Sequence, residues 1–176
     1  MITLVGKIVL FLILAYLFIF MLSTDGPAAP AYHPPFLLWI LDTINLFIHE
    51  AGHFFLRPFG MFIYILGGSL VQSLLPLALL VVVWKQNYQN TALPGFWLGE
   101  NLVNVSAYIA DAPFRKLKLL AGGLIHDWGY LLAGRTELGP PIGRFVYWIG
   151  MIICAASIVA GVVFAVQSYR GKKVEG

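Results

Sequence analysis

The sequence has very little cysteine and few charged residues. Its only cysteine is Cys154, which excludes both a disulfide framework and an all-cysteine zinc site within one chain. Charged residues make up 11% of the 176 residues, whereas soluble domains usually contain about 25%. Hydrophobic residues make up 60%, and the mean hydropathy is +0.84. This composition excludes an ordinary soluble domain and indicates that nearly the whole chain is a membrane domain.

The basic residues indicate membrane topology rather than nucleic-acid binding. The net charge of +3 comes from 11 basic and 8 acidic residues. The basic residues lie at the ends of hydrophobic runs and do not form one exposed face, which a nucleic-acid-binding protein would need. We therefore expect membrane lipids to surround the chain, and we expect no nucleic-acid partner.

The apolar runs predict an all-α, polytopic helical bundle that forms a single integral membrane domain over residues 1–176. The expected transmembrane segments are 4–22, 36–57, 70–84, 96–112 and 142–167. The loop 23–35 contains four prolines and no Lys or Arg, so we expect it on the extracytoplasmic side. We expect the basic loop 113–141 in the cytoplasm, and we expect the chain to lie in the inner (cytoplasmic) membrane of a bacterium. Five crossings then place the basic C-terminal tail outside, against the same rule, so its orientation stays open.

The N-terminal segment has a second interpretation. Lys7, the apolar run behind it and the small residues 29–31 are also compatible with a secretory signal peptide. We favour a membrane span because the run extends over residues 4–22, which is nearly a full crossing. Pro30 is also unfavourable beside a cleavage site.

Two other segments carry unusual residues. Residues 58–69 contain three glycines and several aromatic residues, which predicts a short re-entrant turn or hairpin better than a continuous helix. In the fourth segment, polar residues fall within roughly a 100° arc of a helix and should face the interior of the bundle. These are Glu100, Asn101, Asn104 and Asp111. Asn101 or Asn104 would bond either to a neighbouring helix or to a substrate, and Gln72 in the third segment is equally ambiguous.

The strongest motif is the HExxH sequence His49-Glu50-Ala51-Gly52-His53. Histidines at positions i and i+4 of a helix project from one face, so both imidazoles can bind a single Zn²⁺. Glu50 would be the catalytic base that takes a proton from the attacking water and passes it to a leaving amine. The alternative is a polar core in which Glu50 satisfies a histidine. A cluster of this kind at membrane depth nevertheless predicts a functional site.

Zinc needs a third protein ligand if one position is to stay open for chemistry. His33 lies among prolines in the expected outside loop and is predicted to be a surface residue. The other candidates are His126, Asp127, Asp111 and Glu100. Glu100 and Asp111 lie in the fourth segment, and His126 and Asp127 lie in the region after it, on which the choice converges.

The motif and its surroundings resemble the site-2 protease family of intramembrane zinc metalloproteases. The resemblance covers His49–His53, the Arg57-Pro58-Phe59-Gly60 and Gly67-Gly68-Ser69 stretches behind it, and a later Gly-rich segment that contains Asp127. It implies a compact, divergent member with HExxH on a transmembrane helix, a membrane-associated hairpin after it, and a distant aspartate as the third zinc ligand. The family's distal pattern of Asn and Pro followed by Leu, Asp and Gly is absent, and residues 122–128 stand in its place. Asp127 matches the family's aspartate by type, whereas His126 would give a three-histidine site.

Two functions follow from these expectations. The first is a zinc metalloendopeptidase that cleaves a transmembrane or membrane-proximal peptide. The second is a non-proteolytic accessory or scaffold subunit of a larger membrane complex, which would retain a metalloprotease-like fold. The first function implies a membrane-protein or peptide substrate, and the second implies other membrane subunits as partners.

Overall fold

The computed structural model describes residues 4–24, 32–117 and 125–174, and the elements in these ranges are helices. The α-helices are α1 (Leu4–Ser23), α2 (Phe36–Leu56), α3 (Met61–Asn87), α4 (Ala92–Ala110), α5 (Asp127–Leu131) and α6 (Gly139–Val174). Short 3₁₀ turns connect them: η1 (Arg57–Phe59), η2 (Tyr88–Asn90) and η3 (Thr136–Leu138). The all-helical class predicted from the sequence is confirmed for these residues.

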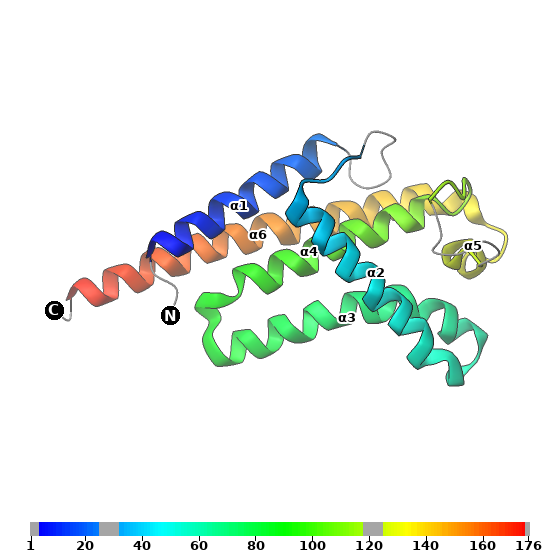
Figure 1. Cartoon of the computed structure of the whole chain (residues 1–176), viewed down its shortest axis with the longest axis horizontal. Coiled ribbons are helices and arrows are strands. Elements are labelled where there is room, and N and C mark those ends of the chain that lie inside the picture. The colour runs from blue at the N-terminus through cyan, green and yellow to red at the C-terminus, as the bar shows by residue number, and fades with distance from the viewer. Residues whose placement is uncertain (1–3, 25–31, 118–124, 175–176) are drawn as a thin grey trace.

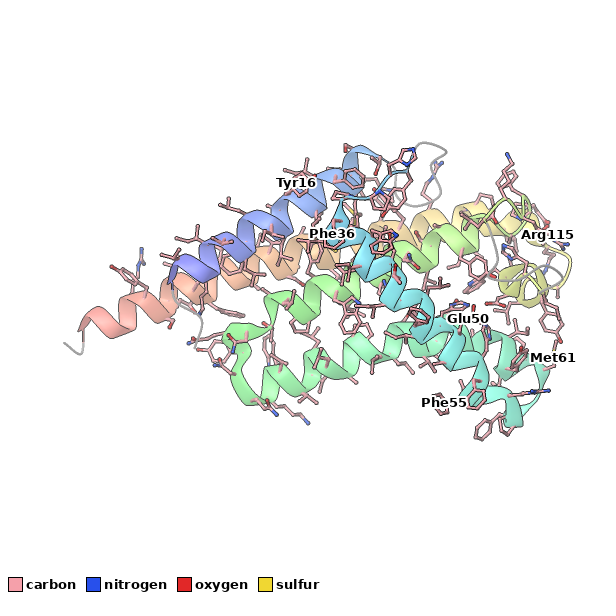
Figure 2. The ribbon with its side chains drawn as sticks, viewed as in Figure 1. Tyr16, Phe36, Glu50, Phe55, Met61 and Arg115 are labelled. Atoms are coloured by element: carbon pink, nitrogen blue, oxygen red, sulfur yellow. The ribbon has the colours of Figure 1, made fainter. Side chains whose placement is uncertain are left out.

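Within the described residues, three helical segments are long and apolar enough to cross a membrane. They are Val5–Ser23, Met61–Asn90 and Thr136–Arg170, which correspond to α1, α3 and α6. Large apolar side chains are exposed on the outside of the bundle, and Tyr16 and Phe55 point away from it (Figure 2). An apolar outer surface of this kind agrees with a location in a membrane.

The helices α1, α3, α4 and α6 run roughly along the long axis of the molecule, and α2 crosses them obliquely (Figure 1). α4 and α6 pack along each other, α1 lies on α6, and α3 packs against both α2 and α4. The short helix α5 lies at the end of the bundle where α4 ends and α6 begins (Figure 1). The buried core joins α1, α2, α4 and α6 through Leu14, Leu17, Met21, Leu38, Ala92, Phe96, Val103, Met151 and Cys154.

Glycines allow α4 and α6 to approach until their backbones touch. A Cβ atom added to Gly99 would lie 2.6 Å from the carbonyl oxygen of Gly150, and one added to Gly150 would lie 2.6 Å from that of Gly99. Both distances are shorter than a carbon–oxygen contact allows. Inside a bilayer, where apolar burial gives little driving force, such close backbone packing is a main source of helix association.

The irregular backbone predicted for residues 58–69 is confined to η1 and Gly60. Gly60 has φ = +92°, a conformation that favours glycine, and the helix α3 begins directly after it. Residues 61–69 are therefore helical and continue into the segment that was expected to begin at Leu70. The prediction of irregular backbone here was wrong because Gly67 serves packing: a Cβ atom on it would lie 2.8 Å from the carbonyl oxygen of Gly52. Contact between α2 and α3 offsets the helix-propensity cost of about 1 kcal/mol per glycine.

We expect Gly150→Leu to lower the stability of the bundle, because the new side chain must push α6 away from α4. Overpacking of a well-packed core typically costs about 1–3 kcal/mol. Thermal denaturation in detergent, followed by circular dichroism, measures the effect. The control is Val159→Leu on the same helix, where the native side chain is 62% exposed and the change should be tolerated. Equal melting temperatures for the two variants would contradict the proposed backbone contact.

Candidate metal centre

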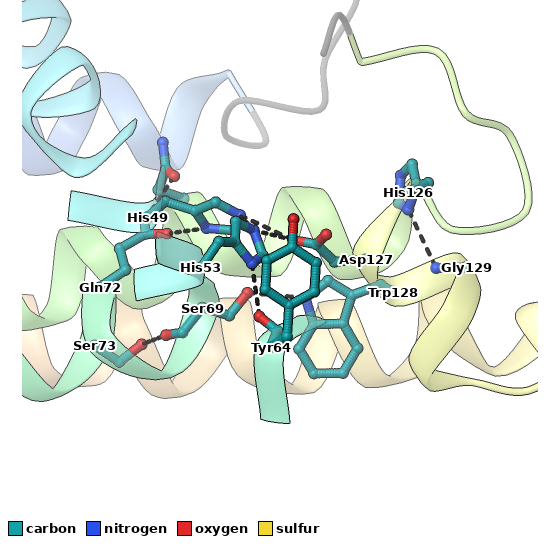
Figure 3. Close-up of polar contacts among 11 residues, drawn as sticks. His49, His53, Tyr64, Ser69, Gln72, Ser73, His126, Asp127, Trp128 and Gly129 are labelled. Carbon is teal, nitrogen blue, oxygen red and sulfur yellow. Dashed lines mark hydrogen bonds and ion pairs between the residues drawn. The ribbon is translucent and has the colours of Figure 1, made fainter. Parts of the chain in front are cut away.

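His49 and His53 lie one turn apart on α2, and their Nε2 atoms are 3.1 Å from each other. Asp127, at the start of α5, brings a carboxylate to the same point: its Oδ2 lies 2.9 Å from Nε2 of His49 and 3.1 Å from Nε2 of His53. Figure 3 shows the three side chains converging from the two helices. His49 and Asp127 are buried, and His53 is half-buried.

The second nitrogen of each imidazole is bonded to a carbonyl oxygen. Nδ1 of His49 lies 2.9 Å from Oε1 of Gln72, and Nδ1 of His53 lies 2.7 Å from the backbone oxygen of Tyr64. A carbonyl oxygen can only accept, so both Nδ1 atoms carry a proton, and in the neutral rings both Nε2 atoms present lone pairs. Two lone pairs and a carboxylate oxygen then face one another, and a cation between them would stabilise this arrangement.

Gly68 on α3 leaves room for that cation. A Cβ atom added to Gly68 would lie 2.5 Å from Nε2 of His49 and 2.6 Å from Nε2 of His53. Any side chain at this position would therefore occupy the space in front of both nitrogens. The absence of a Cβ atom keeps that face of the pair open.

The three atoms fit one metal ion. They lie within 4.8 Å of one another, and each belongs to a residue type that binds metals in proteins. For ligand bonds of about 2.0–2.1 Å, tetrahedral geometry separates two ligand atoms by about 3.3 Å. The observed separations of 2.9–3.1 Å are close to that value. His49, His53 and Asp127 could therefore hold a metal ion.

His126 is turned away from the two histidines. Its Nε2 lies 3.3 Å from Oδ2 of Asp111, and its Nδ1 accepts a hydrogen bond of 3.2 Å from the backbone N–H of Gly129 (Figure 3). His126 thus caps the N-terminus of α5 and fixes the helix that carries Asp127. Of the two ligand candidates left open by the sequence, the structure brings Asp127, and not His126, to the pair on α2.

The remaining candidates lie elsewhere. His33 is exposed, as expected for a loop residue. Asp111 ends α4 and accepts hydrogen bonds from the backbone N–H groups of Lys116 and Leu117. Glu100 is fully buried, and its Oε2 accepts a hydrogen bond of 2.9 Å from Nδ2 of Asn45. Asp111 and Glu100 are therefore structural carboxylates in this arrangement.

The two neighbouring imidazoles affect the acidity of Asp127. Burial acts to raise the pKa of this carboxyl group, but its contacts with His49 and His53, which donate to it when they are protonated, outweigh burial and lower the pKa. Asp127 therefore stays an anion, which is the form that binds a metal.

Two further residues adjoin the centre. Glu50 is half-buried, and its carboxylate makes no hydrogen bond within the described part of the chain. Its charge lies close enough to act on His53 and Tyr108. Tyr108 stacks edge-on to His49 with ring centres 5.6 Å apart, and its hydroxyl lies within hydrogen-bonding reach of the Asp127 backbone. The sequence analysis missed Tyr108. Tyr108 lies four residues after Asn104, which places it on the face of α4 that carries the polar residues. This position was the sequence signal that could have identified it.

Comparison with known proteins adds nothing to these observations, since no protein-family model, no curated protein and no solved structure matches the chain.

We expect Asp127→Ala to lose metal and His126→Ala to keep more of it. Loss of Asp127 removes a ligand atom, whereas loss of His126 only loosens the start of α5, an indirect effect that typically costs about 10- to 100-fold in affinity. Metal titration of the two purified variants, with elemental analysis, compares them. A metal-free His126→Ala protein beside a fully loaded Asp127→Ala protein would reverse the assignment.

We also expect Gly68→Ala to displace the two imidazoles and weaken metal binding, because its Cβ atom would enter the space between them and the metal. The control is Ala78→Ser at an exposed, helical position of α3 away from the histidines. Metal affinity is the readout, and circular dichroism checks that both variants are folded. Unchanged affinity in Gly68→Ala would show that this glycine does not border the metal.

Proposed function

We propose that the protein is a zinc-dependent intramembrane endopeptidase of the site-2 protease type, which cleaves a transmembrane or membrane-proximal peptide. The observation that carries the proposal is the convergence of the two HExxH histidines with Asp127. They meet through the Nε2 atoms of the histidines and Oδ2 of the aspartate, which are the atoms that bind metals. Metal peptidases need such a set of three protein ligands.

The ligand set favours zinc and leaves a position for the reaction. Two imidazole nitrogens and one carboxylate oxygen match the ligand types of known catalytic zinc sites, which keep a fourth position open. When bound, zinc supplies Lewis acidity, which polarises a carbonyl group and makes water more acidic. His49, His53 and Asp127 would hold the ion.

Glu50 is the proposed catalytic base. It follows His49 directly on α2, and its carboxylate is not engaged in a hydrogen bond within the described residues. A carboxylate in this position takes a proton from the attacking water and then delivers it to the nitrogen of the leaving amine. The ring of Tyr108 lies against His49 and its hydroxyl lies near the Asp127 backbone, so this hydroxyl is the proposed donor of a hydrogen bond to the oxygen of the substrate carbonyl.

We further propose that α2 and α4 cross the membrane together with α1, α3 and α6, which gives five crossings. Both helices carry polar residues that make them less apolar than the other three. These residues bond to each other across the interior: Asn104 to Asp42, and Asn45 to Glu100. Paired in this way, they do not meet lipid, which is the condition for polar groups at membrane depth. The turn at η1 and Gly60 is the proposed remnant of the hairpin that follows HExxH in the family.

We expect Glu50→Gln to keep zinc and the fold but to abolish function, because glutamine has the shape of glutamate and cannot take up a proton. The test is complementation of a deletion strain, with zinc content and membrane abundance measured for the variant. Glu137→Gln, the same substitution at an exposed position in η3, is the control and should complement.

Full complementation by a zinc-loaded Glu50→Gln protein would contradict the peptidase proposal. It would favour the second function considered for this sequence, an accessory or scaffold subunit of a membrane complex, because assembly does not depend on proton transfer.

A further inference from the structure

A chain of hydrogen bonds leads from the candidate metal centre, through neighbouring helices, to a carboxyl group on α2 itself. It begins at Nδ1 of His49, which bonds to Oε1 of Gln72 on α3 at 2.9 Å. Nε2 of Gln72 donates to Oδ1 of Asn104 on α4 at 3.0 Å, and Nδ2 of Asn104 donates to Oδ1 of Asp42 at 3.0 Å. Asp42 lies on α2, the helix of His49, so the chain passes through three helices and returns to the first.

Each link in this chain fixes the orientation of the next. A side-chain amide has one end that donates and one that accepts, and an ionised carboxylate only accepts. Because Asp42 accepts, Asn104 must present its NH₂ group to Asp42 and its oxygen to Gln72. Gln72 must then donate to Asn104 and accept from His49. The proton of His49 is thereby held on Nδ1, and Nε2 is left free.

Asp42 is surrounded by donors, which supports its role as the accepting end. The hydroxyl of Tyr32 donates to its Oδ2 at 3.2 Å, and Asn104 donates to its other oxygen. The carboxyl groups of Asp42 and Glu100 are also hydrogen-bonded to each other. Two carboxylates in contact cannot both be ionised, so one proton lies between them. Since Asp42 already accepts from two donors, that proton belongs to Glu100.

The two histidines of the centre differ in how their protons are fixed. Nδ1 of His53 bonds to the backbone oxygen of Tyr64, which is always an acceptor because a backbone carbonyl cannot be exchanged for a donor. Nδ1 of His49 bonds to a side-chain amide, which can rotate and exchange its donor and acceptor ends. Gln72 is 2% exposed, so water does not take the place of a lost partner. His49 therefore depends on the chain beyond Gln72, and His53 does not.

We propose that Asn104 and Asp42 are positioning residues that set the tautomer of His49 through Gln72, and so keep its Nε2 atom free to bind the metal. The inference rests on the metal centre of the proposed function and adds to it three residues that do not contact the ion. Without Asn104, the NH₂ group of Gln72 would lose its acceptor. The side-chain amide of Gln72 would then rotate by half a turn, so that its NH₂ group donates to Nδ1 of His49. The proton of His49 would move to Nε2, where it would prevent this atom from binding the metal.

The test is Asn104→Leu, a substitution of similar volume, in the full-length protein. We expect two changes: at a pH high enough to keep both rings neutral, the His49 proton moves from Nδ1 toward Nε2 in metal-free protein, and zinc affinity falls by about 10- to 100-fold. Nitrogen NMR of protein labelled with ¹⁵N-histidine reports the tautomer of each ring. The signal of His53 is an internal reference and should keep its proton on Nδ1.

The matched control is Asn101→Leu, which lies on the same helix and is more deeply buried. Asn101 donates to Oδ1 of Asn45, which also accepts from Trp97, and it has no part in the chain to His49. Zinc affinity and both tautomers should stay as in the wild type. Gln72→Met removes the acceptor itself and provides a second test if Asn104→Leu does not fold; it too should release the His49 proton from Nδ1.

A rescue separates tautomer control from a merely structural role. In the double variant Gln72→Glu/Asn104→Leu, the carboxylate at position 72 can only accept, so the His49 proton should return to Nδ1 and zinc affinity should recover. Loss of packing at position 104 would not be repaired in this way. A folded Asn104→Leu protein with the wild-type tautomer of His49 would overturn the proposal. Absence of zinc binding by the wild type would instead refute the proposed function, because the tautomer is measured without metal.

Discussion

The centre of this structure depends on an electrostatic constraint: three atoms that bear lone pairs face one another about 3 Å apart in an apolar bundle. A positive charge among them would stabilise the arrangement, and the neighbouring residues keep the three atoms in place. The HExxH spacing places two of the atoms on one face of α2. The cap at His126 holds the third in position, and Gly68 keeps the space beside them clear.

Packing and chemistry are linked through the glycines of α3. The contact between Gly67 and Gly52 brings α3 against α2, and this approach puts the carbonyl oxygen of Tyr64 within 2.7 Å of His53. The backbone oxygen of a helical residue has a second lone pair beyond its helical hydrogen bond, and here it accepts from the imidazole. A bulkier α3 would therefore lose both the helix contact and the partner that fixes the His53 ring.

Several parts of the structure could be predicted from the sequence, and others could not. Hydropathy located α1 and α6, and the helical period of HExxH placed His49 and His53 on one face. The choice between Asp127 and His126 depends on where α5 begins, and a shift of one residue there reverses which side chain faces α2. The backbone oxygen of Tyr64 gives no sequence signal, because every residue has one. Residues 61–69 looked like a turn because their glycines serve a contact with α2, which no local pattern reports.

The pairing of polar residues between α2 and α4 has a consequence for biogenesis. α2 is synthesised before α4, and until α4 arrives the side chains of Asp42 and Asn45 lack their partners Asn104 and Glu100. An unpaired carboxyl group and amide in hydrocarbon are costly, so in the proposed five-crossing topology α2 would gain little from entering the bilayer alone. The most stable route in that topology keeps α2 at the membrane surface or beside the insertion machinery until α4 is made, and then brings the two helices into the bilayer as a pair. The order of membrane integration would then differ from the order of synthesis.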